Sequence, residues 1–160
     1  MNLPTSSDPF PGDTSSTAQP GEVPSADGGA ILLVDDDPAV GAGMAKLLGR
    51  HGFEVLLAAN GAKAMRTLAA QRVGLVITDI FMDQMDGLET IAELRRKRPE
   101  LPIVAISGGS PRVPVDCLAL ARALGAAEVL SKPISIETML GVVQRHGHGV
   151  TRMAMATMES

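Results

Sequence analysis

The sequence predicts an α/β fold in which helices cover both faces of a five-stranded parallel sheet. Five short apolar runs alternate with five helical patterns between residues 29 and 146, which is the order of repeated βα units. The strand runs are apolar throughout, and strands that are buried on both faces of a parallel sheet have this pattern. Right-handed crossovers then give a doubly wound (βα)5 arrangement with all strand carboxyl ends at one edge.

Each predicted strand is a short apolar run that stops at a polar residue or a turn. The first run ends at consecutive acids, the third at Asp79 and the fourth at Ser107. Ligands of open α/β sheets bind outside this carboxyl edge, so these endings are candidate site positions. The predicted strands cover residues 30–34, 53–58, 75–78, 103–106 and 128–131.

Each predicted helix has helical spacing or a recognisable start or stop signal. Val40, Met44 and Leu47 share one side of the first helix, which Gly52 follows as a stop. Asn60 has the residue type of a helix N-cap. The predicted helices cover residues 38–51, 60–71, 87–97, 114–124 and 135–145.

The two ends of the chain lack these patterns. Residues 1–28 are rich in Pro, Ser, Thr, Gly and Asp and nearly free of apolar residues, so we expect a disordered N-terminal tail. Residues 147–160 also show no clear period and are expected to form a C-terminal tail. The ordered domain is therefore expected at 29–146, with too few residues after it for an output domain.

Composition excludes several classes of function. The formal net charge of −4 disfavours direct nucleic-acid binding, and the cations of 95–98 are interpreted as a solvated last helical turn. No apolar run approaches the roughly 20 residues of a bilayer span, so we expect no membrane insertion. The single cysteine, Cys117, excludes an internal disulfide, fits a reducing cytoplasm and is expected to be a small core residue.

Polar residues gather where the predicted strands end. A cluster of carboxylates on a partly buried edge needs neutralisation, and Mg²⁺ prefers such oxygen ligands together with phosphate oxygens. A lysine supplies a positive charge for phosphate and a serine supplies a hydroxyl donor. Together these groups suit phosphoryl transfer to an aspartate, which depends mostly on positioning and charge neutralisation. The residues are Asp35, Asp36, Asp37, Asp79, Ser107 and Lys132.

Each of these residues also has an ordinary structural interpretation. Asp37 precedes Pro38 and has the residue type of a helix N-cap, the role that we favour for it. Ser107 before two glycines fits a turn, and Lys132 before a proline fits a solvated surface position. The combination on one edge of the sheet is what favours a functional site.

The sequence resembles the receiver domain of bacterial two-component response regulators over residues 29–146. This resemblance implies a flavodoxin-like strand order of 2-1-3-4-5. It also implies a cytoplasmic signalling domain that is not itself an enzyme. The matching motifs are ILLVDDDP at 31–38, VITD at 76–79, MDQMDG at 82–87, ISG at 106–108, LGA at 124–126 and LSKP at 130–133.

The resemblance also implies a role for each matching site residue. Asp79 corresponds to the phosphoacceptor. Mg²⁺ would be held by Asp35, Asp36 and Asp79 with the backbone carbonyl of Phe81. Ser107 corresponds to the hydroxyl that contacts the phosphoryl group, and Lys132 to the phosphate-binding lysine, whose bond to Pro133 is cis in this family. The implied phosphodonor is a sensor histidine kinase or a histidine phosphotransfer protein, and the downstream partner is an unidentified protein.

Three features, the last of which involves two positions, depart from the family pattern. Asp83 replaces the usual proline of the loop after the phosphoacceptor, and Val129 replaces an aromatic residue that turns inward on activation. We therefore expect any switch to rely on Ser107 and the segment after it. Phe81 and Gly109 occupy positions that influence how water reaches the acyl phosphate, and apolar Phe81 favours slow self-dephosphorylation.

Two other functions were weighed against the phosphoacceptor. A pseudo-receiver would keep the fold as a constitutive interaction module without phosphorylation, but the complete set of acids, hydroxyl and lysine argues against it. An aspartate-nucleophile phosphatase would need a second aspartate two residues after its nucleophile, where this chain has Phe81. A magnesium-dependent phosphodonor assay separates the first two functions, and turnover of a phosphate ester identifies the third.

Overall fold

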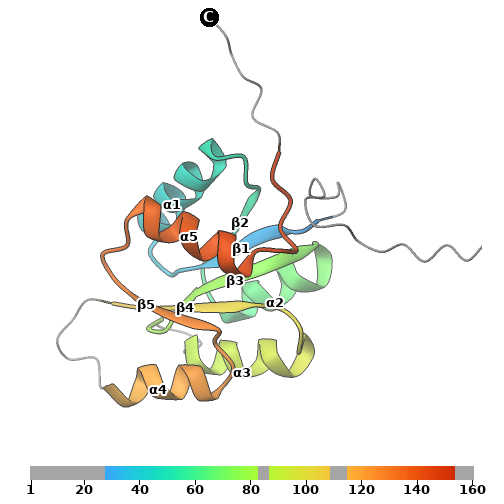
Figure 1. Ribbon diagram of the computed structural model, residues 1–160. Helices are drawn as coiled ribbons and strands as arrows, with labels where there is room; N and C mark the ends of the chain where they lie inside the picture. Colours follow the sequence, from blue (N-terminus) through green and yellow to red (C-terminus); the bar gives the residue numbers. More distant parts are fainter. Residues whose placement is uncertain (1–27, 83–86, 109–114, 154–160) are drawn as a thin grey trace, which may run out of the picture.

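The computed structural model shows one parallel sheet of five strands in the order β2-β1-β3-β4-β5, as the sequence predicted (Figure 1). It describes residues 28–82, 87–108 and 115–153. The strands are β1 Ala30–Val34, β2 Val55–Ala58, β3 Val73–Asp79, β4 Ile103–Ser107 and β5 Glu128–Ser131. The helices are α1 Pro38–Arg50, α2 Gly61–Ala70, α3 Gly87–Lys97, α4 Val115–Ala123 and α5 Ile136–His146.

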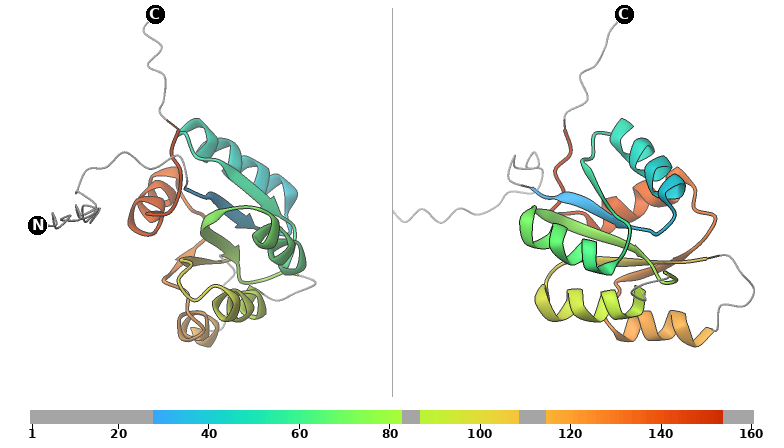
Figure 2. Two further views of the ribbon diagram at one scale, coloured as in Figure 1. Left: turned by 90° about the vertical axis from the view of Figure 1, so that its right-hand side faces the viewer. Right: turned by 180° about the vertical axis from the view of Figure 1, so that it is seen from behind.

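Helices cover both faces of the sheet (Figures 1 and 2). Helices α1 and α5 lie on one face, and α2, α3 and α4 lie on the other. Because successive strand residues point to opposite faces, Ile31 and Leu33 pack with α1 and α5, whereas Leu32 and Val34 pack with α2, α3 and α4. This explains why the strand runs are apolar throughout: each face has its own buried core.

Strand β3 begins earlier than the sequence predicted, at Val73 instead of residue 75. Val73 pairs with Ala30, and the register shifts just after this pair. Gly74 permits this extension because a Cβ there would lie 2.3 Å from the carbonyl oxygen of Gly149. The close backbone approach at Gly74 therefore permits the extension, and Val73 packs against the core at its start. Strand β2 begins at Val55, two residues later than predicted.

The chain does not leave the domain at Gly147, so the prediction of a loose tail is wrong for residues 147–153. The amide of Gly29 donates to Gly149 O at 2.7 Å, and Thr151 N donates to Gly29 O at 2.9 Å. Val150 is 5% exposed and belongs to the core beneath α1 and α5. Backbone pairing and one buried side chain hold this segment, and neither produces a visible sequence period.

Some sequence-based expectations concern residues outside the described ranges. These are the N-terminal tail up to residue 27, the C-terminal residues 154–160, and the loop positions Asp83, Gly109 and Pro114. Among the described helices, none is long and apolar enough to cross a membrane. Cys117 is half-buried on α4.

A surface ion-pair cluster joins the start of β5 to the end of α5. Glu128 accepts from Arg145 Nη2 at 2.8 Å and lies 2.8 Å from His146 Nε2. Burial raises the pKa of Glu128, but the hydrogen bonds and charges of Arg145 and His146 outweigh it, so the pKa falls below its ordinary value of 4.5. The ionised carboxylate therefore stabilises the fold at pH above 4.5, and this contribution disappears as pH falls through the lowered value.

We expect Glu128→Gln to lower the free energy of unfolding at neutral pH by less than about 1 kcal/mol, because the pair is exposed to solvent. Urea unfolding between about pH 3 and pH 7 should show the difference from wild type vanish in acid. Glu54→Gln makes the same charge change at an exposed residue just before β2 and serves as the matched control. A difference for Glu128→Gln that is constant with pH would contradict the assignment.

Candidate functional site

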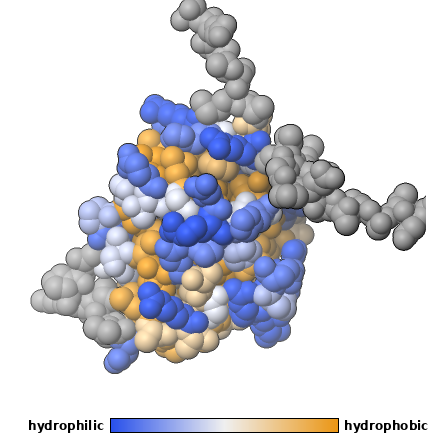
Figure 3. Space-filling model, viewed as in Figure 1, coloured by the Kyte–Doolittle hydropathy of each residue, from blue (hydrophilic) through white to orange (hydrophobic). Residues whose placement is uncertain are grey.

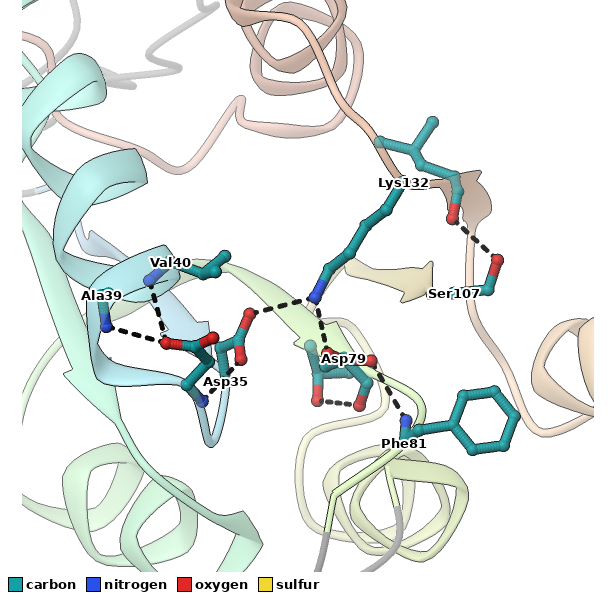
Figure 4. A network of polar contacts seen from close by, with 10 residues as sticks. Asp35, Ala39, Val40, Asp79, Phe81, Ser107 and Lys132 are labelled. Carbon is teal, nitrogen blue, oxygen red and sulfur yellow. Dashed lines mark hydrogen bonds and ion pairs between the residues drawn. The ribbon is translucent and has the colours of Figure 1, made fainter. Parts of the chain in front are cut away.

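The polar residues predicted from the strand ends converge at the carboxyl edge of the sheet (Figure 4). Asp35 follows β1, Asp79 ends β3, Ser107 ends β4 and Lys132 follows β5. The parallel ladders align these ends, because Val34 pairs with Thr78, Asp79 with Ile106, and Ser107 with Ser131. Side chains up to 97 residues apart in sequence therefore meet in one place.

Three carboxylates form the acidic part of the site. Asp35, Asp36 and Asp79 each offer an oxygen atom, and these atoms lie within 4.8 Å of one another. Asp79 is 6% exposed, whereas Asp36 is open to solvent. The backbone amide of Asp37 donates to Asp35 Oδ1 at 2.9 Å, which fixes the orientation of that carboxylate. The site thus combines one buried carboxylate with one that faces water.

Lys132 joins two of these carboxylates. Its Nζ atom lies 2.9 Å from Asp79 Oδ2 and 3.4 Å from Asp35 Oδ2 (Figure 4). Partial burial of the ammonium lowers its pKa, but the hydrogen bonds and charges of Asp79 and Asp35 outweigh burial and raise the pKa of Lys132 above its ordinary value. Lys132 therefore stays charged at neutral pH. Its peptide bond to Pro133 is cis, as the resemblance implied.

The loop after β3 is held close to the acidic cluster. The amide of Phe81 donates to Asp79 Oδ1 at 3.1 Å, and the amide of Gly87 donates to Ile80 O at 2.9 Å. Phe81 itself is 45% exposed, so its ring borders the site without covering Asp79 from all sides. Both oxygens of Asp79 are thus oriented, one by Lys132 and one by a backbone amide.

Gly87 has a role that the sequence motif did not explain. A Cβ atom at this position would lie 2.0 Å from Asp79 O and 2.5 Å from Ile80 Cα. Helix α3 can therefore begin against the backbone of the acceptor strand only because residue 87 lacks a side chain. The Asp-Gly pair in the motif was the available signal, but sequence alone does not reveal which backbone it approaches.

Ser107 reaches the same edge but its hydroxyl points toward β5. Its Oγ donates to Leu130 O at 3.4 Å and lies 3.5 Å from Ser131 Oγ. The residue is 3% exposed. These long contacts are weak hydrogen bonds. The Ser107 hydroxyl thus faces β5 in this structure, and it would have to turn toward Asp79 for the role that the resemblance implies.

Asp37 is a helix cap, as we favoured from the sequence. Its Oδ1 accepts from the amides of Ala39 at 3.0 Å and Val40 at 3.3 Å (Figure 4). The Asp37 carboxylate is thus bonded to the first turn of α1. The acidic cluster consists of Asp35, Asp36 and Asp79.

A cavity of about 450 Å³ adjoins the site between α1 and the segment after β5. Its lining is mostly apolar, with Val40, Met44 and Ile134 beside the polar groups of Asp35 and Lys132. This cavity is not visible in the sequence, because its walls come from segments that are far apart in the chain. The apolar side of α1 supplied the only available signal.

The donor set fits a divalent cation of the magnesium type. Ligand oxygens on an octahedral Mg²⁺ at about 2.1 Å lie about 2.9 to 4.2 Å apart. The three carboxylate oxygens, within 4.8 Å of one another, need only small side-chain shifts to reach this spacing. All three donors are hard oxygen atoms, and a carbonyl such as that of Phe81 is a ligand of the same kind.

Comparison with known proteins shows the same class. The sequence matches the response regulator receiver domain family over residues 31–144. The chain belongs to this family, and it is therefore a receiver domain of two-component signalling. Its fold matches the chemotaxis protein CheY4 of Vibrio cholerae with a TM-score of 0.68 and 28% identity, covering 74% of this chain and 98% of that one. It matches the NtrX receiver domain of Brucella abortus with a TM-score of 0.67 and 29% identity, covering 72% and 96%.

The curated relatives are longer proteins. The transcriptional regulatory protein GlrR of Escherichia coli is 36% identical over 115 residues, which cover 68% of this chain and 24% of GlrR. The response regulator MprA of Mycolicibacterium vanbaalenii is 34% identical over 110 residues, which cover 69% of this chain and 46% of MprA. The chain thus matches about a quarter of the first relative and just under half of the second.

Proposed function

We propose that Asp79 accepts a phosphoryl group from a phosphohistidine on a sensor kinase or phosphotransfer protein. The observation that carries this proposal is the pairing of a buried aspartate with a lysine inside a cluster of carboxylates: Lys132 Nζ lies 2.9 Å from Asp79 Oδ2. An Asp79 oxygen forms the new bond to phosphorus, and the bond from phosphorus to the imidazole nitrogen of the donor breaks. The electron pair of that bond returns to the nitrogen.

The remaining residues of the site bind and orient the reacting group. Asp35, Asp36 and Asp79 would hold Mg²⁺ together with the backbone carbonyl that the resemblance implies for Phe81, and the cation would neutralise charge on the transferring oxygens. The Lys132 ammonium would move from Asp79 Oδ2 to a phosphoryl oxygen. The amide of Phe81 orients the other carboxylate oxygen, Oδ1.

Ser107 would carry the change in charge to the surrounding structure. The phosphoryl group adds roughly two negative charges, which attract the Ser107 hydroxyl away from Leu130 O. Because residue 129 is valine and lacks a large side chain to rotate, the response is expected to pass through Ser107 and the segment after β4. The output of residues 29–146 is then a protein contact with an unidentified target.

A small phosphodonor tests this function against the pseudo-receiver. We expect the chain to be labelled by acetyl phosphate when Mg²⁺ is present and to lose the label when EDTA is added beforehand. A phosphatase would instead turn over p-nitrophenyl phosphate continuously. Absence of magnesium-dependent labelling would favour an interaction module that keeps only the fold.

Removal of the lysine should strengthen magnesium binding. In Lys132→Gln the ammonium no longer neutralises Asp79 and Asp35, so the cation meets less competition. We expect the apparent Mg²⁺ affinity to rise about tenfold. The upper limit is the interaction of two unit charges, which is about 4 kcal/mol at 4 Å and an effective dielectric constant of about 20, and the expected effect is well below it. Thermal unfolding across a magnesium titration measures this effect.

The control for this experiment is Lys63→Gln, which removes an exposed lysine from the first turn of α2. It should leave the magnesium titration unchanged. Equal or weaker magnesium binding by Lys132→Gln would contradict the placement of the cation beside this ammonium.

Phe81 is expected to slow loss of the phosphoryl group. Its side chain is apolar and 45% exposed, so it offers no hydrogen bond to orient an attacking water. We expect Phe81→Asn to release phosphate about tenfold faster than wild type, which is below the roughly 10²- to 10⁴-fold effect of a general base because an amide only orients the water. Phosphate release after removal of the donor measures this rate. A wild-type lifetime of seconds, or no acceleration in the variant, would count against this role.

A further inference from the structure

The edge of the sheet opposite the proposed acceptor site is rich in cations. All five strands begin and all five helices end at this edge, because each helix runs back against its strand (Figures 1 and 2). The described carboxylates at this edge are Glu54, Glu100 and Glu128, together with Glu93 near the end of α3. The cations at the same edge are Arg50, Arg72, Arg95, Arg96, Lys97, Arg98, Arg122, Arg145 and Arg152.

A hollow of about 480 Å³ opens on this edge. Arg72, Arg98, His146 and His148 line it, and Glu100 is the one carboxylate among its lining residues in the described part of the chain. Figure 3 shows hydrophilic residues at the lower right of the molecule, below the grey atoms, with apolar residues among them. Arg72 and Arg98 thus bring two positive charges to the lining of the hollow, although each also has a partner within the protein.

Two of these arginines donate hydrogen bonds to backbone carbonyl oxygens, which carry no net charge. Arg98 Nη2 donates to Leu68 O at 3.4 Å, and Arg95 Nη2 donates to Gly125 O at 2.6 Å. A carbonyl satisfies a guanidinium donor without cancelling its charge. Arg96 and Lys97 pair with Glu93 only at the exposed helix surface, where such pairs contribute little. Positive charge on this edge is therefore only partly neutralised by the fold.

The N-terminal segment has the complementary charge and begins at the rim of this hollow. Residues 1–27 contain no lysine or arginine, and their carboxylates account for the entire formal net charge of −4. Gly29 lines the hollow, and its amide donates to Gly149 O at 2.7 Å. The segment is thus tethered beside Arg72 and Arg98. Its carboxylates are Asp8, Asp13, Glu22 and Asp27.

We propose that the acidic N-terminal segment, residues 1–27, binds the basic hollow of its own domain. A chain reaches at most about 3.5 Å per residue, so Asp27 and Glu22 stay within about 25 Å of Gly28 and always have the hollow in reach. Attachment within a few residues of the hollow gives these carboxylates an effective concentration of about the millimolar range. Weak individual charge contacts are therefore sufficient for substantial occupancy.

The contact has a consequence for other anions. A polyanion that approaches the basic edge must displace the tethered carboxylates. The segment therefore reduces the affinity of this edge for phosphate-rich ligands while leaving the acceptor edge open. This inference is independent of phosphorylation at Asp79, because the two sites lie at opposite edges of the sheet.

A spin label on the segment tests the contact in the full chain. The label is attached to Ser16→Cys in a Cys117→Ala background, and paramagnetic broadening of backbone amides is measured by NMR. We expect broadening of Gly74, Arg98 and Gly149 at about 0.1 M salt and its loss at about 1 M, because the screening length falls from about 10 Å to about 3 Å.

Charge variants separate this contact from simple proximity. Arg72→Gln with Arg98→Gln should reduce the broadening, whereas Lys46→Gln with Lys63→Gln removes the same charge elsewhere and should not. Broadening that persists at 1 M salt, or that is equal in both double variants, would overturn the proposal. A neutral-segment variant should also lose the broadening; it carries Asp8→Asn, Asp13→Asn, Glu22→Gln and Asp27→Asn.

Competition supplies a second readout. We expect the neutral-segment variant to bind inorganic tripolyphosphate about threefold more tightly than wild type, because a tethered competitor has been removed. The Arg72→Gln, Arg98→Gln double variant should bind it more weakly than either. Equal tripolyphosphate affinity of wild type and the neutral-segment variant would show that a separate anion, and not the segment, is the occupant of the hollow, and would overturn the proposal.

Discussion

We expect the Asp79→Asn variant to take up no phosphoryl group from acetyl phosphate in the presence of Mg²⁺. The amide that replaces the carboxylate is a poor nucleophile and carries no charge for a divalent cation. The fold should persist, because Lys132 keeps Asp35 as a partner and the amide of residue 81 can still donate to the oxygen of the new side chain. Labelling is measured by intact-protein mass spectrometry.

The control is Asp37→Asn, which changes a neighbouring carboxylate in the same way. Asp37 caps α1 by accepting from the amides of Ala39 and Val40, and asparagine caps helices equally well. Labelling of Asp37→Asn should therefore equal that of wild type. Labelling of Asp79→Asn at wild-type rate would place the acceptor elsewhere.

The second large effect is expected from Gly87→Ala. The new methyl group would lie 2.0 Å from Asp79 O and 2.7 Å from Ile80 O, and backbone atoms cannot move aside as a flexible side chain can. We expect the free energy of unfolding to fall by about 3 kcal/mol, the upper range for overpacking. Phosphorylation should also slow, because α3 and the acceptor strand must separate.

Gly43→Ala provides the matched control in an exposed helical position. No atom lies within 4 Å of the Cβ that would be added there, so the change should stabilise the protein by about 0.5 to 1 kcal/mol through helix propensity. Urea unfolding of the two variants should thus give shifts of opposite sign. A neutral Gly87→Ala would contradict the close approach of α3 to the acceptor strand.

The fold could be predicted from the sequence because the central strands β1, β3 and β4 bury both of their faces. Ile31 and Leu32 belong to different cores, so the strand has no polar alternation, and parallel pairing follows from that pattern. The helix bounds could also be predicted from the sequence. Helix α3 spans the range 87–97 that the motif and the cationic last turn predicted. Caps by Asp37, Asn60 and Ser135 have the geometry that their residue types suggest.

What the sequence could not show is contact between backbones and orientation of side chains. The extension of β3 and the pairing of residues 149–152 depend on close approach of Gly29, Gly74 and Gly149, which produces no period. The strand ends predicted that Ser107 lies at the carboxyl edge, but its direction toward Leu130 follows from the register of β5. The charge of the opposite edge is also hidden, because its cations come from many separate loops.

Peptide mapping of the labelled wild-type chain tests the central claim most directly. The chain is incubated with acetyl phosphate in Mg²⁺ or in EDTA, digested, and the acyl phosphate is located by tandem mass spectrometry. The account predicts one phosphoryl group, on Asp79 and only in Mg²⁺. A phosphoryl group on Asp35, Asp36 or any other residue, equal labelling in EDTA, or no labelling at all would contradict it.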